Sequence, residues 1–312
     1  MVLHPEQMLP AGIAITVVVT AFNFWGDFYV MCSTPITVNQ SGINMNNLLT
    51  LNQVSIYDPH SEKKRVDNLS FSLKQGRTLA IVGESGSGKS LISKAIIGLL
   101  PSTLALSGEI FLMKSPSFIF RATTACLLGT SLGMIVQNGM SAFDPLIKIG
   151  KQVSQTLIYH FSYTKLQAFN ATKQALDEVF EHQSLMIMQA FPHQLSGGQL
   201  QRVMIAMALA LSPRLLIADE PTTALDAPLR REILQLLQRI TISKNTTLIF
   251  ISHDLGLVSQ IADDILVMKE GKLIEFGDKN SVLDTPKQAY TRYLIEARAK
   301  LSQRFAQVLY AR

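Results

Sequence analysis

The sequence predicts an α/β fold, in which strands and helices alternate along most of the chain. Three observations carry this prediction. An apolar run at 79–82 leads directly into a glycine-rich loop, as a buried parallel strand often does. Between 138 and 211 strand signals fade and apolar residues recur at helical spacing. Near the end of the chain, two strand-like runs flank Glu270-Gly271 in the pattern of a hairpin.

Composition sets the outer limits of the fold and its partners. The 312 residues are 47% hydrophobic and 16% charged, which predicts one large globular domain or two smaller ones and excludes a disordered chain. The net charge of +5 suits an anionic membrane surface, and because Lys and Arg are scattered we expect no nucleic-acid partner. The only cysteines, Cys32 and Cys126, indicate neither a disulfide framework nor a zinc site, so a reduced cytosolic environment is expected.

The first 44 residues differ from the rest of the chain. From Met8 to Trp25 the sequence is almost wholly apolar, which is borderline against the ~20 residues of a membrane-spanning helix. No Lys or Arg precedes this stretch and no clear cleavage site follows it, so a signal peptide is not expected. A second methionine, Met45, opens onto the first strand-like run. We therefore expect residues 1–44 to lie outside the fold that follows.

From Met45 onward the predicted elements follow in order. A helix is expected from Lys89 or Ser90 to about Leu100, where Pro101 stops it. Strand-like runs stand at 48–57, 79–82, 215–218, 247–251, 265–268 and 272–276, and helical spacing marks Ala168, Ala171, Ala175, Val179 and 203–211. We expect a main domain at 45–280 with a helical insertion at about 138–212, and a C-terminal helical tail at 281–312.

The glycine-rich loop at 83–90 fits the pattern of a phosphate-binding loop. Its glycines let the backbone turn sharply and approach phosphates, Lys89 supplies positive charge to the β- and γ-phosphates, and Ser90 offers a hydroxyl to Mg²⁺. A flexible Gly/Ser loop is the alternative, which the preceding strand and following helix disfavour. The predicted nucleotide-binding residues of this loop are Gly83, Ser85, Gly86, Gly88, Lys89 and Ser90.

Two adjacent acids, Asp219 and Glu220, follow the apolar run at 215–218. Because consecutive residues point in different directions, Asp219 would hold a metal ion while Glu220 faces an attacking water. A lone acidic pair after a strand is usually a solvated turn. The phosphate loop upstream and the Pro-Thr-Thr-Ala-Leu-Asp run at 221–226 favour the functional interpretation.

The run Leu-Ser-Gly-Gly-Gln at 195–199 stands between the loop and the two acids. Alone it would be a loop leading into a helix. A helix N-terminus after Ser-Gly-Gly presents free N–H groups and the positive end of a dipole, which suits the charge on a departing phosphoryl group. Together with the phosphate loop, this run indicates two halves of one divided ATP site.

In their order along the chain, from the phosphate loop through the Leu-Ser-Gly-Gly-Gln run to the two acids, these motifs resemble those of the ATP-binding subunits of ABC transporters. The resemblance covers Met45 to about Arg292. The resemblance implies a P-loop NTPase fold of the ABC type, with a β-rich N-terminal subdomain and a helical insertion. It implies hydrolysis of ATP with Mg²⁺, and a heterodimer or homodimer in which the signature helix completes the partner subunit's site.

The resemblance also implies a role for each matching residue. The implied catalytic residues are Gln137 of the Q-loop, the general base Glu220 and the switch histidine His253. The implied metal ligands are Ser90, Gln137 and Asp219. Nucleotide contacts are implied for Tyr57, which would stack on adenine, and for Ser196, Gly197, Gly198, Gln199 and Asp226. The alternatives are a strand-end aromatic at Tyr57 and an idle surface histidine at His253.

Within the superfamily, three further runs resemble the peptide/nickel importer ATPases. They are Gln137-Asn138 with 141–146, Phe-Pro-His-Gln at 191–194, and Thr-Pro-Lys-Gln-Ala-Tyr-Thr-Arg at 285–292. The segment His4–Asp27 resembles the end of the permease subunit of such an importer. No cysteine follows Cys126, which argues against the iron–sulfur cluster of the peptide-transporting branch and favours a nickel importer.

The resemblance implies a subunit at the cytoplasmic face of the bacterial inner membrane. It would energise uptake of nickel or of di- and oligopeptides through permease subunits, with a periplasmic solute-binding protein as an indirect partner. Two alternatives remain: a non-transport ABC-type ATPase and a membrane-anchored ATPase. The first would normally carry two ATPase domains or a long coiled coil, and the second needs the leader to span the membrane. Met186, Met188, His182 and His193 are interpreted as helix core and surface.

Overall fold

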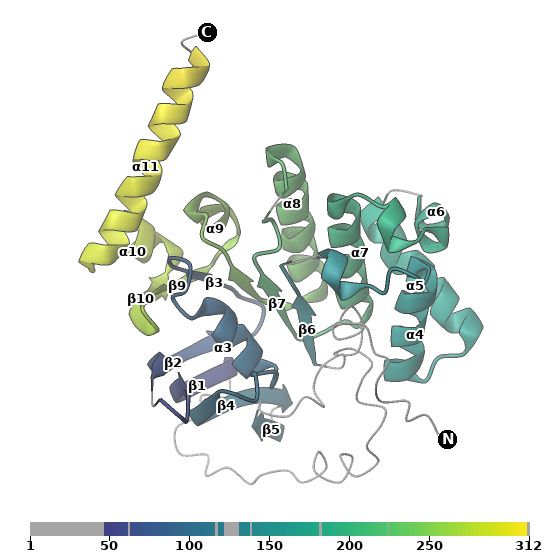
Figure 1. The fold of residues 1–312 in the computed structure, drawn as a ribbon, viewed down its shortest axis with the longest axis horizontal. Coiled ribbons are helices and arrows are strands. Elements are labelled where there is room, and N and C mark those ends of the chain that lie inside the picture. Colours follow the sequence, from purple (N-terminus) through teal and green to yellow (C-terminus); the bar gives the residue numbers. More distant parts are fainter. Residues whose placement is uncertain are drawn as a thin grey trace. The chain divides into compact units, whose positions relative to one another are not determined.

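The computed structural model describes residues 47–61, 63–115, 118–121, 131–137, 139–180, 183–223 and 225–310 (Figure 1). The chain divides into two compact units. Of the described residues, the sheet unit comprises those within 47–121, 217–220 and 241–310, and the helical unit comprises those within 131–216 and 221–240. The leader expected at 1–44 lies outside the described residues.

The first sheet of the sheet unit has four strands in the order β2-β1-β4-β5. They are β1 (Asn47–Tyr57), β2 (Lys64–Lys74), β4 (Ala105–Ser115) and β5 (Phe118–Arg121). Strand β1 is antiparallel to β2 and β4, and β5 is antiparallel to β4. The strand expected at 48–57 is therefore confirmed as β1.

The second sheet has the order β10-β9-β3-β8-β7-β6. Its strands are β3 (Thr78–Val82), β6 (Leu132–Ile135), β7 (Leu215–Asp219), β8 (Thr247–Ile251), β9 (Asp264–Lys269) and β10 (Lys272–Asp278). Strand β3 runs parallel to β8 and β9, and every residue of β3, β7 and β8 is buried, which explains their unbroken apolar sequences. The three predicted buried strands and the β9–β10 hairpin are confirmed. The boundary between the units falls inside β7, after Leu216.

The helices of the sheet unit are α3 (Lys89–Ile96), α9 (Leu255–Ile261), α10 (Lys279–Asp284) and α11 (Ala289–Tyr310). The predicted end of α3 at about Leu100 is wrong, because the helix stops at Ile96. Gly98 takes a φ of +73° and its N–H bonds the carbonyl of Ala95, while the N–H of Leu99 bonds that of Lys94. This pattern is a Schellman cap, which ends a helix at glycine before Pro101 can act.

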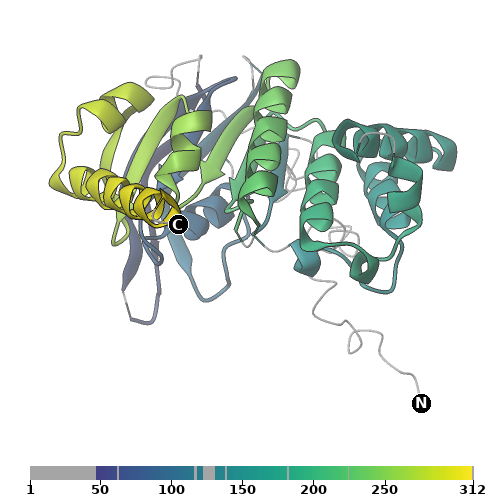
Figure 2. The ribbon, with the colours of Figure 1, turned by 90° about the horizontal axis from the view of Figure 1, so that it is seen from above.

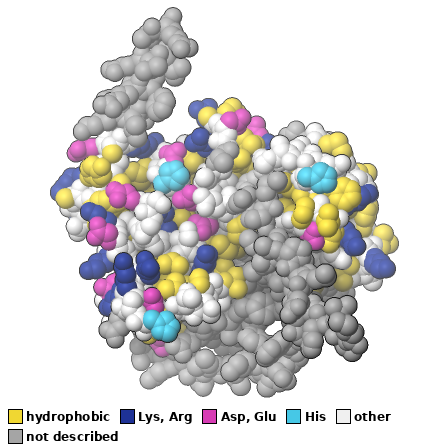
Figure 3. Space-filling model, in the orientation of Figure 1, with side chains coloured by type: hydrophobic (Ala, Val, Ile, Leu, Met, Phe, Trp, Pro, Cys, Tyr) yellow, Lys and Arg dark blue, Asp and Glu magenta, His cyan; other side chains and the backbone are white. Residues whose placement is uncertain are grey.

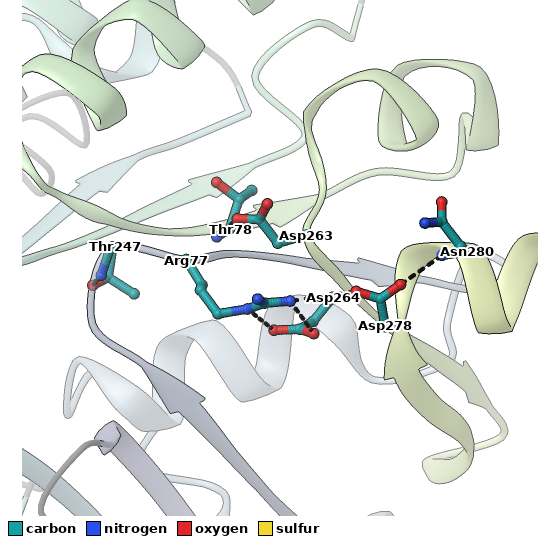
Figure 4. Close-up of polar contacts among 8 residues, drawn as sticks. Arg77, Thr78, Thr247, Asp263, Asp264, Asp278 and Asn280 are labelled. Carbon is teal, nitrogen blue, oxygen red and sulfur yellow. Dashed lines mark hydrogen bonds and ion pairs between the residues drawn. The ribbon is translucent and has the colours of Figure 1, made fainter.

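A charged network fixes β3 against β9 in the sheet unit (Figure 4). Arg77 donates from Nε and Nη2 to the two carboxylate oxygens of Asp264, at 2.7 Å each. Its Nη2 also lies 3.6 Å from Asp278 Oδ2. The N–H of Thr78 donates to Asp263 Oδ2 at 2.8 Å. The planar guanidinium fits the carboxylate with two parallel bonds, so this pair fixes the strand register as well as neutralising charge.

Arg77→Met is expected to lower the free energy of unfolding by about 1–2 kcal/mol, because Asp264 then loses two charge-assisted hydrogen bonds. Urea unfolding at neutral pH measures this change. Arg65→Met is the matched control, since Arg65 is exposed on β2 of the first sheet and its replacement should leave the midpoint unchanged. Equal midpoints for Arg77→Met and the wild type would contradict the role of the pair.

The helical unit contains α4 (Ile149–Phe161), α5 (Lys165–Phe180), α6 (Ser184–Gln189), α7 (Gly197–Ala210) and α8 (Ala227–Lys244) as far as Ile240, with short 3₁₀ turns η4 (Gly139–Ala142) and η5 (Pro192–Gln194). Figure 2 shows α4 to α7 gathered into one bundle. Leu157, Ala168 and Leu211 form a buried cluster within it. The predicted helical spacing is confirmed, with Ala175 and Val179 also buried.

Two remaining expectations concern membranes and metals. No helix among the described residues is long and apolar enough to cross a bilayer. Met186 is 59% exposed whereas Met188 is 4% exposed, so these two side chains lie on different sides of α6. His182 lies outside the described residues.

Candidate functional site

The glycine-rich loop runs from the end of β3 to the start of α3, and its backbone requires glycine. Gly83 has a φ of +155°, and a Cβ there would lie 2.2 Å from the carbonyl oxygen of Met268 on β9. Gly88 has a φ of +99°, and a Cβ there would lie 3.0 Å from Val66 Cγ2. A larger residue at either position would push the loop off the strands behind it. Gly86 also has a positive φ and faces open space, while Ser85 lies in the exposed turn.

Lys89 lies buried beneath the loop, with 5% of its surface exposed. Its Nζ donates to the carbonyl oxygens of Gly83 at 2.9 Å and Glu84 at 2.8 Å. Burial lowers the pKa of Lys89, although Glu220, Asp219 and Glu84 act to raise it. The loop therefore curls around a partly desolvated ammonium group, an arrangement suited to an incoming anion.

Ser90 and Asp219 meet across 129 residues of sequence, where Ser90 Oγ donates to Asp219 Oδ1 at 3.0 Å. Asp219 ends β7 and is 7% exposed. Burial raises its pKa and Glu220 adds to the rise, while the Ser90 bond opposes it. A hydroxyl and a buried carboxylate are hard oxygen donors of the type that Mg²⁺ binds. No group of three or more His, Cys, Asp or Glu side chains suited to a metal occurs in the part of the chain that the structure describes.

Glu220 adopts a strained backbone conformation, with a φ of +47°. Its N–H donates to the carbonyl of Ile251 at 3.0 Å, which holds it against the end of β8. Its Oε1 lies 3.4 Å from Nδ1 of His253, and the His253 side chain is 64% exposed. Non-glycine residues in the left-handed region are uncommon and cluster at functional sites. The sheet unit thus brings together the loop, Ser90, both acids and His253.

Tyr57 ends β1 and is half-buried. In the first sheet it stands opposite Lys64 on one side and Ala105 on the other. Its contact with an adenine ring stays a prediction.

The predicted Ser-Gly-Gly-Gln run begins α7 in the helical unit. Ser196 is its N-cap: Ser196 Oγ accepts from the N–H of Gln199 at 3.2 Å, and Gln199 Oε1 accepts from the N–H of Ser196 at 2.9 Å. This reciprocal pair is a capping box. The N–H groups of Gly197 and Gly198 belong to the first turn, where a helix offers them no internal partner. Ser196 and Gln199 therefore orient the turn, which leaves its backbone to meet a ligand.

Gly198 has a second reason to be glycine that the sequence did not reveal. A Cβ there would lie 2.1 Å from Cδ2 of Leu229 on α8, within the same unit. Leu229 is a residue that the sequence analysis missed, since no local pattern signals contact between two helices separated by a strand.

Asp226 and Gln137 also belong to the helical unit. Asp226 Oδ1 accepts from the N–H of Leu229 at 3.0 Å, so the side chain caps α8. Gln137 follows β6 and is exposed. The predicted residues thus divide between the units: the phosphate loop, Asp219, Glu220, His253 and Tyr57 in one, and Gln137, 196–199 and Asp226 in the other.

The sequence matches the profile of the ABC transporter family over residues 66–223, about half of the chain. The matched segment contains the phosphate loop, the Leu-Ser-Gly-Gly-Gln run and the two acids.

Three curated relatives are similar over most of this chain. The metal-staphylopine import system ATP-binding protein CntD of Staphylococcus aureus is 40% identical over 271 residues, which cover 84% of this chain and 97% of that protein. The oligopeptide transport ATP-binding protein OppD of Lactococcus lactis is 41% identical over 256 residues, which cover 80% and 75%. The glutathione import ATP-binding protein GsiA of Escherichia coli is 38% identical over 265 residues, which cover 82% of this chain and 42% of that protein.

Two solved structures share the fold. CbiO1 from Clostridium perfringens, described as part of an ABC transporter complex, aligns with a TM-score of 0.65 at 26% identity, covering 77% of this chain and 92% of that one. The ATP-binding cassette MJ0796, a dimer bound to ADP and phosphate, aligns with a TM-score of 0.64 at 26% identity, covering 74% and 98%.

Proposed function

Because the chain belongs to the ABC transporter family as one of its ATP-binding subunits, we propose that it hydrolyses ATP to drive a bacterial importer. The proposal rests on a cluster of four side chains near the carboxyl ends of β3 and β7. Ser90 bonds Asp219 there, and Glu220 lies beside His253. Together with the loop around Lys89, this is the equipment that phosphoryl transfer needs.

Nucleotide phosphates bind in the loop at 83–90. A phosphate oxygen is a stronger hydrogen-bond acceptor than the carbonyls of Gly83 and Glu84. The ammonium of Lys89 therefore exchanges these two bonds for bonds to phosphate when ATP binds. The N–H groups of the loop and the first turn of α3 point toward the same phosphates. Tyr57 would stack on the adenine ring.

Magnesium fits the pair formed by Ser90 and Asp219. Both present oxygen atoms, and the burial that raises the pKa of Asp219 favours a cation that neutralises the carboxylate. Bound there, the ion would neutralise charge on the transferring phosphoryl group. Gln137 is the third proposed ligand.

Glu220 is the general base that accepts a proton from the attacking water. The strained backbone aims its carboxylate past the end of β7, and His253 orients that carboxylate from 3.4 Å away. A positioned base of this kind contributes about 10²–10⁴-fold to a rate.

The second half of each site comes from a partner subunit. The N–H groups of Gly197 and Gly198, at the positive end of α7, would contact the γ-phosphate held by the partner's loop. Asp226 would stand near the same interface. MJ0796, the similar cassette, is a dimer in its phosphate-bound structure, and this chain is proposed to pair with a sister ATPase subunit or with a second copy of itself.

The cargo is proposed from the relatives, which import metal-staphylopine, oligopeptides and glutathione. A nickel complex or a small peptide therefore enters through permease subunits, supplied by a solute-binding protein. The ATPase subunit lies on the cytoplasmic face of the bacterial inner membrane.

Membrane association separates this proposal from its rivals. The full chain is expressed alone and with its permease pair, and the membrane-bound fraction and its ATPase activity are measured. Association only with the permease supports the importer subunit. Association without the permease would indicate a membrane-anchored ATPase, and no association in either case would indicate a non-transport ATPase.

The permease is proposed to dock on exposed apolar side chains of the helical unit. Leu146 is 82% exposed, and Leu185 and Met186 on α6 are more than half exposed. Two bonds join their segments: Lys148 Nζ donates to Gln189 Oε1 at 2.9 Å, and the N–H of Ile149 to the carbonyl of Ala190 at 3.0 Å. Figure 3 shows hydrophobic side chains exposed over this part of the chain. Such a group is typical of a protein-binding surface.

Leu146→Asp is expected to reduce binding to the permease at least about tenfold, because it places a charge in an apolar contact. Co-purification with the permease measures the loss. Ile242→Asp is the matched control, since Ile242 is equally exposed at 82% but lies at the end of α8. Equal binding by Leu146→Asp and the wild type would remove Leu146 from the docking surface.

A further inference from the structure

Helix α7, which begins with the Ser-Gly-Gly-Gln run, lies beside α8, which begins just after Asp226 (Figure 1). Their first turns approach closely, because a Cβ at Gly198 would lie 2.1 Å from Cδ2 of Leu229. The N–H of Leu229 in turn donates to Asp226 Oδ1 at 3.0 Å. The two stretches proposed to face the partner subunit, 196–199 and Asp226, are therefore joined through one leucine.

One turn further along α7, Arg202 contacts two other helices. Its Nη2 forms an ion pair with Glu232 Oε2 on α8, and its Nη1 donates to the carbonyl of Val179 on α5 at 3.5 Å. Arg239 on α8 donates from Nη2 to the neighbouring carbonyl of Glu178 at 3.1 Å. The last carbonyls of a helix have no partner within it, so cations are favoured there. Arg202 thus connects α5, α7 and α8.

The three helices leave a hollow where they meet. Its lining includes Asp177 and Val179 of α5, Arg202 of α7, and Glu232 and Leu236 of α8. Because side chains do not fill this space, packing alone does not fix the angle between α7 and α8 here. The ion pair supplies that constraint. The side chains of Arg202 and Glu232 are 27% and 56% exposed, so the pair contributes little to overall stability.

The proposed divided ATP site needs this angle to be fixed. The N–H groups of Gly197 and Gly198 would have to lie within hydrogen-bond distance of the γ-phosphate held by the partner's loop. Asp226 would meet the same interface at the same time. A misplacement of about 1 Å in such a site can cost on the order of 100-fold in rate. A rotation of α7 against α8 would bring one of the two stretches to the partner without the other.

We propose that Arg202 is a positioning residue, which joins α7 to α8 and to the end of α5 so that the Ser-Gly-Gly turn and Asp226 meet the partner subunit as one rigid surface. Glu232 is its partner in this role. Neither side chain touches the nucleotide. The inference rests on the proposed ATPase function and adds a pair of residues that supports the signature half of the site.

Arg202→Met is expected to lower the kcat for ATP by about 5–10-fold, because the signature turn is no longer held at the correct angle. The Kd for ADP should stay within about twofold, since the phosphate loop belongs to the sheet unit. Steady-state ATPase assays of the full chain, assembled with its permease pair and partner ATPase subunit, measure kcat. Titration of the purified chain with ADP measures the Kd.

Lys173→Met is the matched control. Lys173 Nζ lies 2.6 Å from Asp177 Oδ2, and these side chains are 43% and 28% exposed. The pair has a comparable exposure and lies in the same unit, but it joins one turn of α5 to the next. Its loss should leave kcat and the Kd for ADP unchanged. Arg202→Lys retains a cation for Glu232 and should recover most of the lost kcat.

A double-mutant cycle tests the pair itself. Glu232→Gln alone should lower kcat, and adding it to Arg202→Met should cause no further loss. Glu232→Gln also carries the test if Arg202→Met does not fold, because it removes the charge on α8 and leaves Arg202 in place.

The inference would be overturned by an unchanged kcat in both single variants, by an equal loss in Lys173→Met, or by additive losses in the cycle. A rise in the Kd for ADP that matches the fall in kcat would also overturn it, because it would show general damage to the fold. Each of these results presupposes a wild-type chain that hydrolyses ATP. Absence of wild-type hydrolysis would instead contradict the proposed function, so the two failures are distinguishable.

Discussion

Glu220→Gln is expected to bind ATP with nearly wild-type affinity and to hydrolyse it at least about 100-fold more slowly. The amide preserves the size of the side chain but cannot accept the proton of the attacking water. Because the bound ATP stays intact, it should hold two subunits together. Single-turnover hydrolysis and size-exclusion chromatography with ATP and Mg²⁺ measure the two effects, and the dimer should persist only in the variant.

Glu109→Gln is the control for this result, since Glu109 is an exposed glutamate on β4 that is not among the predicted site residues. It should hydrolyse ATP normally and give no persistent dimer. A Glu220→Gln variant with the wild-type rate would show that another group activates the water, and the assignment of Glu220 would fail.

Asp219→Asn is expected to remove Mg²⁺-dependent hydrolysis and, at the same time, to stabilise the nucleotide-free protein. The buried carboxylate is disfavoured in the folded state, as its raised pKa indicates. An amide still accepts the hydrogen bond from Ser90 without carrying charge. We expect the melting temperature to rise by about 2–4 °C at pH 7, as for about 1 kcal/mol in a domain of 150–250 residues.

The pH dependence of this gain follows from the direction of the shift. The unfolded carboxyl titrates near 3.8 and the folded one higher, so the wild type loses stability as the pH rises through this interval. The Asp219→Asn variant has no carboxyl to ionise at this position, so its stability does not fall in this way. The difference in melting temperature should therefore vanish near pH 3 and be largest at neutral pH. A difference that is constant with pH would exclude charge burial as its cause.

Asp264→Asn provides the contrasting control. Asp264 receives two bonds from Arg77, so removing its charge should destabilise the protein. If both asparagine variants shifted the melting temperature in the same direction, the distinction between an unfavourable buried carboxylate and a well-paired one would be wrong.

The parts of the fold that local sequence determines were predictable. Strands β3, β7 and β8 are buried along their whole length, so their apolar runs identify them without a structure. Strand β2 was missed because its alternation breaks at Asn68, where a φ of +50° shifts the buried positions from Val66 to Leu69. The apolar residues of β2 are present in the sequence, but they share one face of the strand only because the backbone is irregular at Asn68.

The chemistry of the site was also predictable in outline, because each motif combines residue type with spacing. The contact of Gly198 with Leu229 was not, since it depends on two helices distant in the chain. The capping role of Asp226 has a local signal, an aspartate three residues before the N–H that it accepts from.

The left-handed backbone at Glu220 has a consequence for how this sequence can drift. Such a conformation costs a non-glycine residue about 1–3 kcal/mol, and glycine or asparagine would adopt it at a lower cost in free energy. Under selection for thermal robustness alone, a population of variants would replace the glutamate. Retention of this glutamate in a lineage therefore indicates continuing selection for ATP hydrolysis. Its replacement by glycine would indicate a copy that is no longer selected for catalysis.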